Sequence, residues 1–208
     1  MQNVNYQRRL DSLIADLAEI LENTEPPSLL LHSCCAPCSS YCLEYLAEHF
    51  RITILYYNPN ITDSSEYTKR VEEQKRLISE LPVRFPVNFV EGEYKPSDFY
   101  NIAKGLETAP EGGERCFKCY RLRLEYAANY AKQHGFDYFC TTLSISPMKN
   151  AAKLNERGSE LSEIYSVNWL PSDFKKRNGY KRSIELSREY GLYRQDYCGC
   201  EFSKKIDN

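Results

Sequence analysis

The chain has 208 residues, of which 42% are hydrophobic and 27% are charged, so it is not a disordered tail and fits one globular domain of ordinary size. Its nine cysteines fall short of the fraction found in small disulfide scaffolds, and a chain of this length buries a core without cross-links. The 27 basic and 29 acidic residues give a net charge of −2, so any contact with nucleic acid needs a local basic patch.

The first 27 residues are predicted to form an N-terminal helical extension that ends near Pro26 and Pro27. Its apolar residues recur with helical spacing and are Leu10, Leu13, Ile14, Leu17, Ile20 and Leu21. The segment lacks the pattern of a secretory signal, and no apolar run reaches the roughly 18 residues that a membrane span needs. We therefore expect a cytoplasmic protein with no membrane partner. In a reducing cytoplasm, cysteines are metal ligands or redox groups more often than structural disulfides.

From residue 28 onwards, strand and helix patterns alternate. Strands are predicted at residues 29–33, 52–57, 87–90 and 138–143, and helices at residues 39–50, 66–81, 117–134 and 183–190. Such alternation implies crossover connections and a mostly parallel sheet. We therefore expect residues 28–208 to form a single α/β catalytic domain, a Rossmann-like open sheet with helices on both faces and a helical C-terminal segment.

Eight of the nine cysteines fall into three groups along the chain. The groups are Cys34, Cys35, Cys38 and Cys42; Cys116 and Cys119; and Cys198 and Cys200. The first two groups lie at predicted helix starts, where backbone N–H groups favour thiolates, and the first also follows a strand. Because ligands of such sheets bind beyond the carboxyl ends of the strands, we expect a metal site there.

Two cysteine pairs supply the four thiolates that a structural zinc or an iron–sulfur cluster requires. The position of Cys34 and Cys35 at the ligand-binding edge favours the cluster, whose separate irons can bind adjacent thiolates. Zinc and free or redox-active thiols are the alternatives. A disulfide across Gly199 would close a small, strained and easily reduced ring, which favours a two-electron dithiol; the alternative is that one cysteine of this pair is a further metal ligand.

The remaining candidate groups give weaker signals. Cys42 and the lone Cys140 are interpreted as packing residues, and His32 as a core histidine in preference to an acid–base group. The loop at residues 33–40 has no glycine to wrap a phosphate, which disfavours ATP. The basic run at residues 175–182, with Arg188 and Arg194, is either an RNA-docking strip or a solvated surface.

Several segments in a fixed order carry a family resemblance. They are residues 31–39 (LHSCCAPCS), 57–61 (YNPNI) followed by Glu66, Tyr67 and Arg70, 115–123 (RCFKCYRLR), 141–147 (TTLSISP), 174–176 (FKK) and 197–200 (YCGC). Together they resemble the cobalamin-independent epoxyqueuosine reductases, and the similarity runs from about residue 30 to residue 202. Six motifs in the right order are far more specific than any single cysteine pair.

This resemblance implies an oxidoreductase that reduces epoxyqueuosine to queuosine, with two electrons, at the wobble position of tRNA. It implies a 4Fe-4S cluster on Cys34, Cys35, Cys116 and Cys119, a redox-active pair at Cys198 and Cys200, and an electron donor that the sequence does not identify. Relatives also hold an additional iron beside the cluster, partly through the residue that matches Cys38. Some members have aspartate at that position. The resemblance therefore implies that Cys38 is a third catalytic residue, beside Cys198 and Cys200, and that it binds metal.

Two rival functions share parts of the pattern. An ATP-dependent tRNA thiolase has a similar sheet but needs a glycine-rich phosphate loop after the first strand. A zinc-stabilised RNA-binding module would use the same thiolates for structure alone, and metal analysis distinguishes it.

Overall fold

The computed structural model describes residues 4–20 and 25–204, and Leu21 of the predicted N-terminal helix lies outside them. The strands are β1 (Ser28–His32), β2 (Arg51–Tyr56), β3 (Asn88–Glu91), β4 (Tyr138–Thr141) and β5 (Asn168–Trp169). They form one parallel sheet in the order β3-β2-β1-β4-β5. The chain order reverses across β1, which is the switch point where open α/β sheets bind their ligands.

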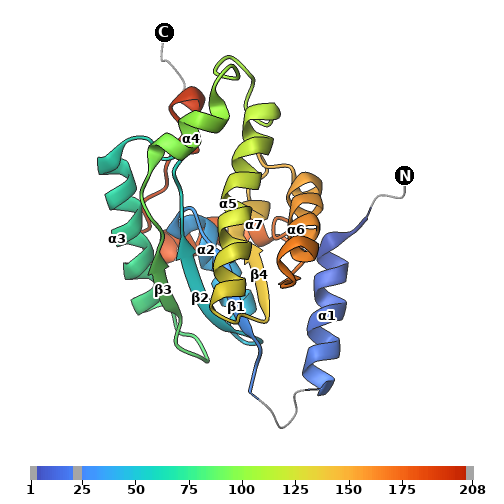
Figure 1. The fold of residues 1–208 in the computed structure, drawn as a ribbon. Helices are drawn as coiled ribbons and strands as arrows, with labels where there is room; N and C mark the ends of the chain where they lie inside the picture. The colour runs from blue at the N-terminus through green and yellow to red at the C-terminus, as the bar shows by residue number, and fades with distance from the viewer. Residues whose placement is uncertain (1–3, 21–24, 205–208) are drawn as a thin grey trace.

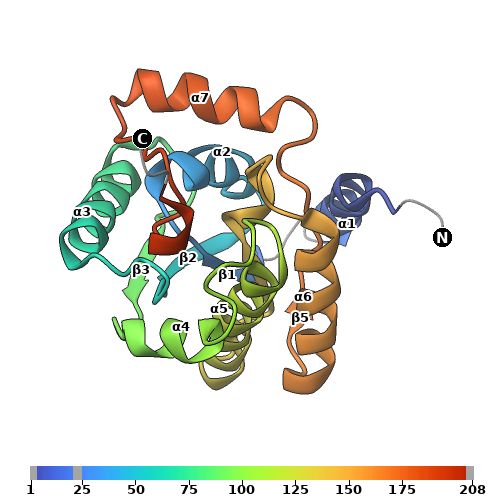
Figure 2. The same ribbon diagram turned by 90° about the horizontal axis from the view of Figure 1, so that it is seen from above.

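The helices are α1 (Tyr6–Ile20), α2 (Ala36–Leu46), α3 (Ser64–Glu80), α4 (Pro96–Ala103), α5 (Glu114–Gln133), α6 (Ala151–Tyr165) and α7 (Gly179–Glu189), with short 3-10 turns η1 (Thr142–Ile145) and η2 (Glu201–Ser203). Figures 1 and 2 show α2 and α3 on one face of the sheet and α4 and α5 on the other. Helix α7 packs outside α2, and α6 lies beside α5. This arrangement confirms the predicted Rossmann-like open sheet with helices on both faces.

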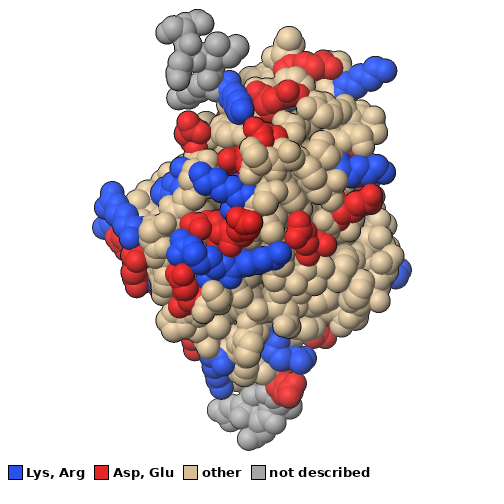
Figure 3. Space-filling model, turned by 90° about the vertical axis from the view of Figure 1, so that its left-hand side faces the viewer, with Lys and Arg blue, Asp and Glu red and all other residues tan. Residues whose placement is uncertain are grey.

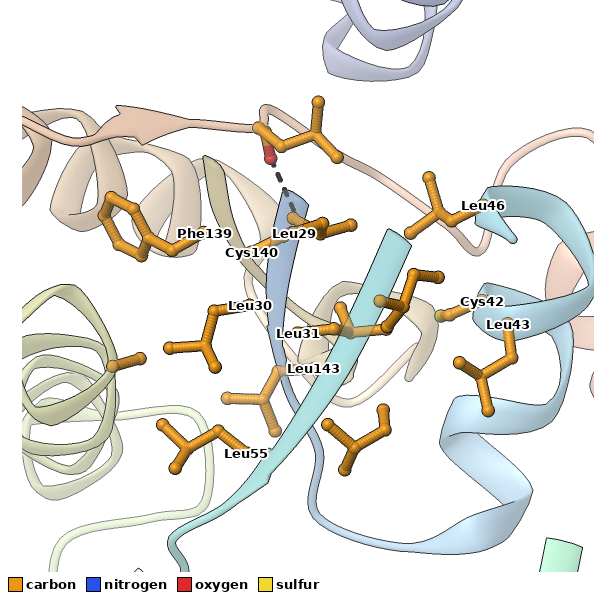
Figure 4. Close-up of a cluster of buried hydrophobic side chains, with 14 of the residues drawn as sticks. Leu29, Leu30, Leu31, Cys42, Leu43, Leu46, Leu55, Phe139, Cys140 and Leu143 are labelled. Atoms are coloured by element: carbon orange, nitrogen blue, oxygen red, sulfur yellow. Dashed lines mark hydrogen bonds between the residues drawn. The ribbon is translucent and has the colours of Figure 1, made fainter. Parts of the chain in front are cut away.

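The core fills the space between the sheet and its helices (Figure 4). The central strand β1 carries Leu29, Leu30 and Leu31, all fully buried because neighbours cover both faces of the strand. Cys42 of α2 and Cys140 of β4 are also fully buried there, which confirms their interpretation as packing residues. The Cys140 thiol donates to the carbonyl oxygen of Leu170 at 3.2 Å.

The helix ends that position the site differ from the predicted ones for local reasons. Helix α2 begins at Ala36 instead of residue 39, because Pro37 sits in its first turn, where a missing N–H costs nothing. Helix α5 begins at Glu114, so Cys116 lies in its first turn. The strand predicted to reach residue 143 ends at Thr141, whose hydroxyl oxygen accepts the N–H of Leu143 at 3.2 Å and starts η1.

The N-terminal helix packs against the rest of the molecule. Leu10 is fully buried in the same core, and the Tyr45 hydroxyl donates to Asp11 Oδ1 at 2.7 Å. The helix is confirmed, and its division from the catalytic domain at residue 27 stays a prediction.

Charged residues of both signs are interspersed on the face that includes α3 (Figure 3). On that helix the Arg76 guanidinium pairs with both Glu73 and Glu80 at 2.9 Å. Among residues 4–20 and 25–204, no helix combines the length and apolar character needed to cross a lipid bilayer.

Candidate functional site

Three thiols gather directly after the central strand β1. The sulfur atoms of Cys34, Cys35 and Cys38 all lie within 4.8 Å of one another, and those of Cys34 and Cys35 are 3.8 Å apart. Cys35 is the extended residue before α2, and Cys38 lies in the first turn of that helix, so the strand-to-helix turn brings the three together. This spacing suits the thiolate ligands of one metal ion or cluster.

Hydrogen bonds among these thiols shift their pKa values in opposite directions. The Cys35 and Cys38 thiols donate to the Cys34 sulfur and hold its pKa well below the usual range. The pKa of Cys35 rises to about 12, and that of Cys38 also rises, because each gives its proton to the Cys34 sulfur. Of the three thiols, Cys34 is therefore the one whose thiolate form its neighbours favour.

The second pair lies on the first turns of α5. The Cys116 sulfur accepts the backbone N–H of Gly112 at 3.2 Å. Cys119, one turn further on, is buried, and burial raises its pKa to about 11. Both residues line a cavity of about 20 Å³ together with Cys198 and Cys200.

The Cys198-Gly199-Cys200 segment is held by residues that follow β2 and by α3. Arg70 Nη1 and Asn60 Nδ2 both donate to the carbonyl oxygen of Cys198 at 3.4 Å. Gly199 has a φ of +95°, and a Cβ there would lie 2.7 Å from the Cγ1 atom of Ile61, so only glycine fits. All nine cysteines are free thiols in the structure.

A larger cavity of about 350 Å³ adjoins the small one. Cys34 and Cys38 lie on its wall, and Cys198, Glu111 and Lys149 line both cavities. Cys198 is therefore the thiol that connects the first cysteine group with the α5 pair. The volume falls within the range of small-molecule sites in proteins.

A buried cation stands among these sulfurs. The Arg123 side chain is 1% exposed, and its Nη1 donates to Asn58 Oδ1 at 3.1 Å, while Nε and Nη2 have no hydrogen-bond partner among the described residues. Burial opposes its charge, but Cys119, Cys198 and Cys34 raise its pKa overall. A buried guanidinium without a carboxylate partner fits a site that holds a negative group.

His32 is a packed core residue, as predicted. Its Nε2 donates to the carbonyl oxygen of Tyr57 at 3.1 Å, so Nδ1 is free to accept from the Thr141 hydroxyl at 2.9 Å. Burial and the nearby Arg123 charge lower its pKa to about 4. The ring therefore ties β1 to its neighbours as a neutral group.

The basic run pairs largely with the chain's own carboxylates. Lys175 pairs with Asp173, Arg177 with Asp11, Lys181 with Glu185, and Arg182 with Glu44. Ion pairs of this kind reduce the positive field that a phosphate backbone would feel. RNA docking on this run stays a prediction.

Sequence reasoning missed the buried cations of the site. Arg123 lies one helical turn after Cys119 and two turns after Cys116, so its position on the thiol-bearing face of α5 was a usable signal. Lys149 contacts Cys198 across 49 residues of chain, and no local pattern announces such a contact.

Known proteins match almost the whole chain. A family model described as Epoxyqueuosine reductase QueH matches residues 29–206. Relatives of that name include the *Staphylococcus epidermidis* protein, 44% identical over 206 residues, which cover 97% of this chain and 85% of the relative. The *Streptococcus pyogenes* protein is 42% identical over 99% of this chain and 80% of its own length. The *Thermotoga maritima* protein is 35% identical over 85% of this chain and 90% of its own.

These similarities confirm the family predicted from the ordered motifs. The chain therefore belongs to the epoxyqueuosine reductase QueH family of oxidoreductases.

Proposed function

We propose that this chain reduces epoxyqueuosine to queuosine at the wobble position of tRNA, using an iron–sulfur cluster and the Cys198/Cys200 dithiol. The reductase activity is supported by the relatives, which are epoxyqueuosine reductases by name. The observation that carries the assignment to residues is the position of Cys198, which lines both the large cavity beside Cys34 and Cys38 and the small cavity with Cys116 and Cys119.

The residues present fit a 4Fe-4S cluster. Arg123 is buried among the thiols with two unpartnered nitrogen atoms, and a cluster held by four thiolates is an anion that would balance this charge. Cys34, Cys35, Cys116 and Cys119 would hold it, and Cys38 lies close enough to Cys34 and Cys35 to share in binding an additional iron. When bound, the cluster supplies single-electron transfer.

The large cavity is the proposed site for the modified base. Met148 is 62% exposed and Tyr180 is 37% exposed, and both line this cavity. An apolar and an aromatic side chain at its wall suit a base that has left the stack of a single-stranded loop. Because the substrate is a tRNA, we place the enzyme in the cytoplasm, with residues 28–208 as its catalytic domain.

The dithiol matches the electron count of the reaction. Reduction breaks both C–O bonds of the epoxide, forms a C=C bond and releases the oxygen as water, which needs two electrons and two protons. Oxidation of Cys198 and Cys200 to a disulfide supplies the two electrons, and acidic groups of the site supply the two protons. An external electron donor then restores the dithiol for the next turnover.

The experiment uses anaerobically purified protein and tRNA from cells that accumulate epoxyqueuosine. We expect iron close to four atoms per chain, or somewhat above, and conversion to queuosine detected by nucleoside mass spectrometry. The double variant Cys198→Ser/Cys200→Ser should keep its iron but lose repeated turnover, whereas Cys140→Ser should behave as wild type. Colourless protein with stoichiometric zinc and no conversion would instead support the zinc-stabilised RNA-binding module.

A further inference from the structure

We propose that Lys149 is a catalytic residue, which makes Cys198 the reacting sulfur of the dithiol and gives one proton to the departing oxygen. Lys149 Nζ lies 3.2 Å from Cys198 Sγ and 3.1 Å from Glu111 Oε1. Among the described residues, it is the side chain that hydrogen-bonds to the Cys198 sulfur. The catalytic step rests on the proposed function, whereas the contact between Lys149 and Cys198 does not.

The position of Lys149 is unusual for a lysine. The residue is 8% exposed, although lysine is rarely buried without a functional or paired role. Its backbone N–H donates to the carbonyl oxygen of Ser146 at 3.1 Å, and Asn150 caps α6 directly after it. The loop that leaves β4 therefore holds the ammonium group at the wall shared by the two cavities.

The two sulfurs of the dithiol have different surroundings. Cys200 is buried against Phe99, Ala103 and Cys119, and burial raises its pKa. Cys198 is half-buried, faces the large cavity and has the Lys149 ammonium beside it. An adjacent cation favours a reacting thiolate, so the contact with Lys149 selects Cys198 over Cys200 as the reacting sulfur.

Other charged or titratable groups also surround Cys198. They are Glu111, Arg70, Arg123, Tyr120, Cys119 and Cys200. Arg70 donates to the backbone carbonyl of Cys198, and the Arg123 charge acts on Cys119, Cys198 and Cys34 without a hydrogen bond to their sulfurs among the described residues. Lys149 therefore differs from these groups in hydrogen-bonding to the Cys198 sulfur itself.

The resulting step balances in atoms and electrons. Its starting groups are the Cys198 thiolate, the Cys200 thiol and the Lys149 ammonium. As both C–O bonds break and the C=C bond forms, the two sulfurs lose two electrons and join in a disulfide. The oxygen takes one proton from Cys200 and one from Lys149 and leaves as water. Lys149 becomes a better acid at that moment, because the thiolate that stabilised its charge has been consumed.

The test compares Lys149→Met with Lys149→Arg and with Lys153→Met, a matched change at a partly exposed lysine of α6 that pairs with Glu156. Reduced holoprotein is treated with iodoacetamide at neutral pH, and tandem mass spectrometry follows Cys198 and Cys200 separately. We expect Lys149→Met to slow labelling of Cys198 by roughly tenfold without slowing that of Cys200. Lys149→Arg should restore most of the rate, and Lys153→Met should match wild type.

Turnover gives a second reading on the same variants. Lys149→Met should lower kcat by about 100-fold with KM little changed, since it removes a proton donor and not a binding group. Unchanged iron content and Tm show that the variant is folded. Wild-type labelling of Cys198 in folded Lys149→Met would overturn the proposal. If the labelling result holds but wild-type protein leaves epoxyqueuosine unchanged, the proposed function fails while the action of Lys149 on Cys198 stands.

Discussion

The molecule places the same residue type in two opposite environments. Cys42 and Cys140 lie among leucines in the core, whereas the other seven cysteines gather at the carboxyl edge of the sheet with buried cations. Burial raises the pKa of Cys140 to about 12, but the pKa of Cys34 falls well below the usual range. Neighbouring donors and charges, and not burial alone, therefore decide which thiols are reactive.

The largest contrast should come from removing one thiol in each environment. Cys34→Ser removes a proposed cluster ligand, so iron should fall well below four atoms per chain and reductase activity should drop by at least about 1000-fold. Cys140→Ala should keep both. Iron and sulfide analysis after anaerobic purification checks the outcome, and full iron content in Cys34→Ser would contradict the ligand assignment.

A smaller effect is expected from the buried cation. Arg123→Met leaves the anionic site without its counter-charge, so loss of iron to a chelator should accelerate roughly tenfold. Arg121→Met provides a matched control, because Arg121 is exposed on the same helix and pairs with Glu125 at 3.8 Å. Equal rates of iron loss in the two variants would show that Arg123 has no part in holding the cluster.

A change in the backbone of the Cys198-Gly199-Cys200 segment should slow turnover. Gly199→Ala places a Cβ against Ile61 and strains a left-handed φ, so we expect kcat to fall about tenfold while iron content stays unchanged. Gly105→Ala carries a similar φ of +77° with open space around it, and should affect stability alone. Single-turnover kinetics on tRNA separate the two effects, and a wild-type rate in Gly199→Ala would argue against a precise dithiol geometry.

The smallest effect should appear in the core. Cys140→Ala removes a buried sulfur and its bond to Leu170, which should reduce the free energy of unfolding by about 1–2 kcal/mol without changing kcat. Urea titration measures the difference. A loss of activity at unchanged iron content would show that core packing around Cys140 affects the reaction at the carboxyl edge of the sheet.

The central part of the fold was predictable because its elements carry strong local patterns. Strands β1, β2 and β4 are buried on both faces and show as apolar runs, and α5 has a long helical period. The missed elements are short or irregular. Strand β5 has two residues, and α6 carries Gly158 where the ring of Trp169 packs, which interrupts its apolar stripe.

The site was only partly predictable for a related reason. The cysteines of the strand-to-helix turn stand close in sequence, so their spacing predicted a shared site after β1, and the structure brings Cys34, Cys35 and Cys38 together. The contact of Lys149 with Cys198 forms only when the loop after β4 meets the end of the chain. Contacts of that kind depend on the tertiary fold and leave no trace in local spacing.

Helix α5 contributes to both the site and the core, so the rotation of its first half relative to its second half is fixed. Its first half carries Cys116, Cys119 and Arg123, and its second half packs Leu124, Ala127, Ala128 and Ala131 into the core. One residue inserted between Arg123 and Leu124 would turn the first half by about 100° and shift it by about 1.5 Å relative to the sheet. The thiols would then face away from Cys198 while the core stayed packed, so the spacing between these two halves is as strict a requirement as the cysteines themselves.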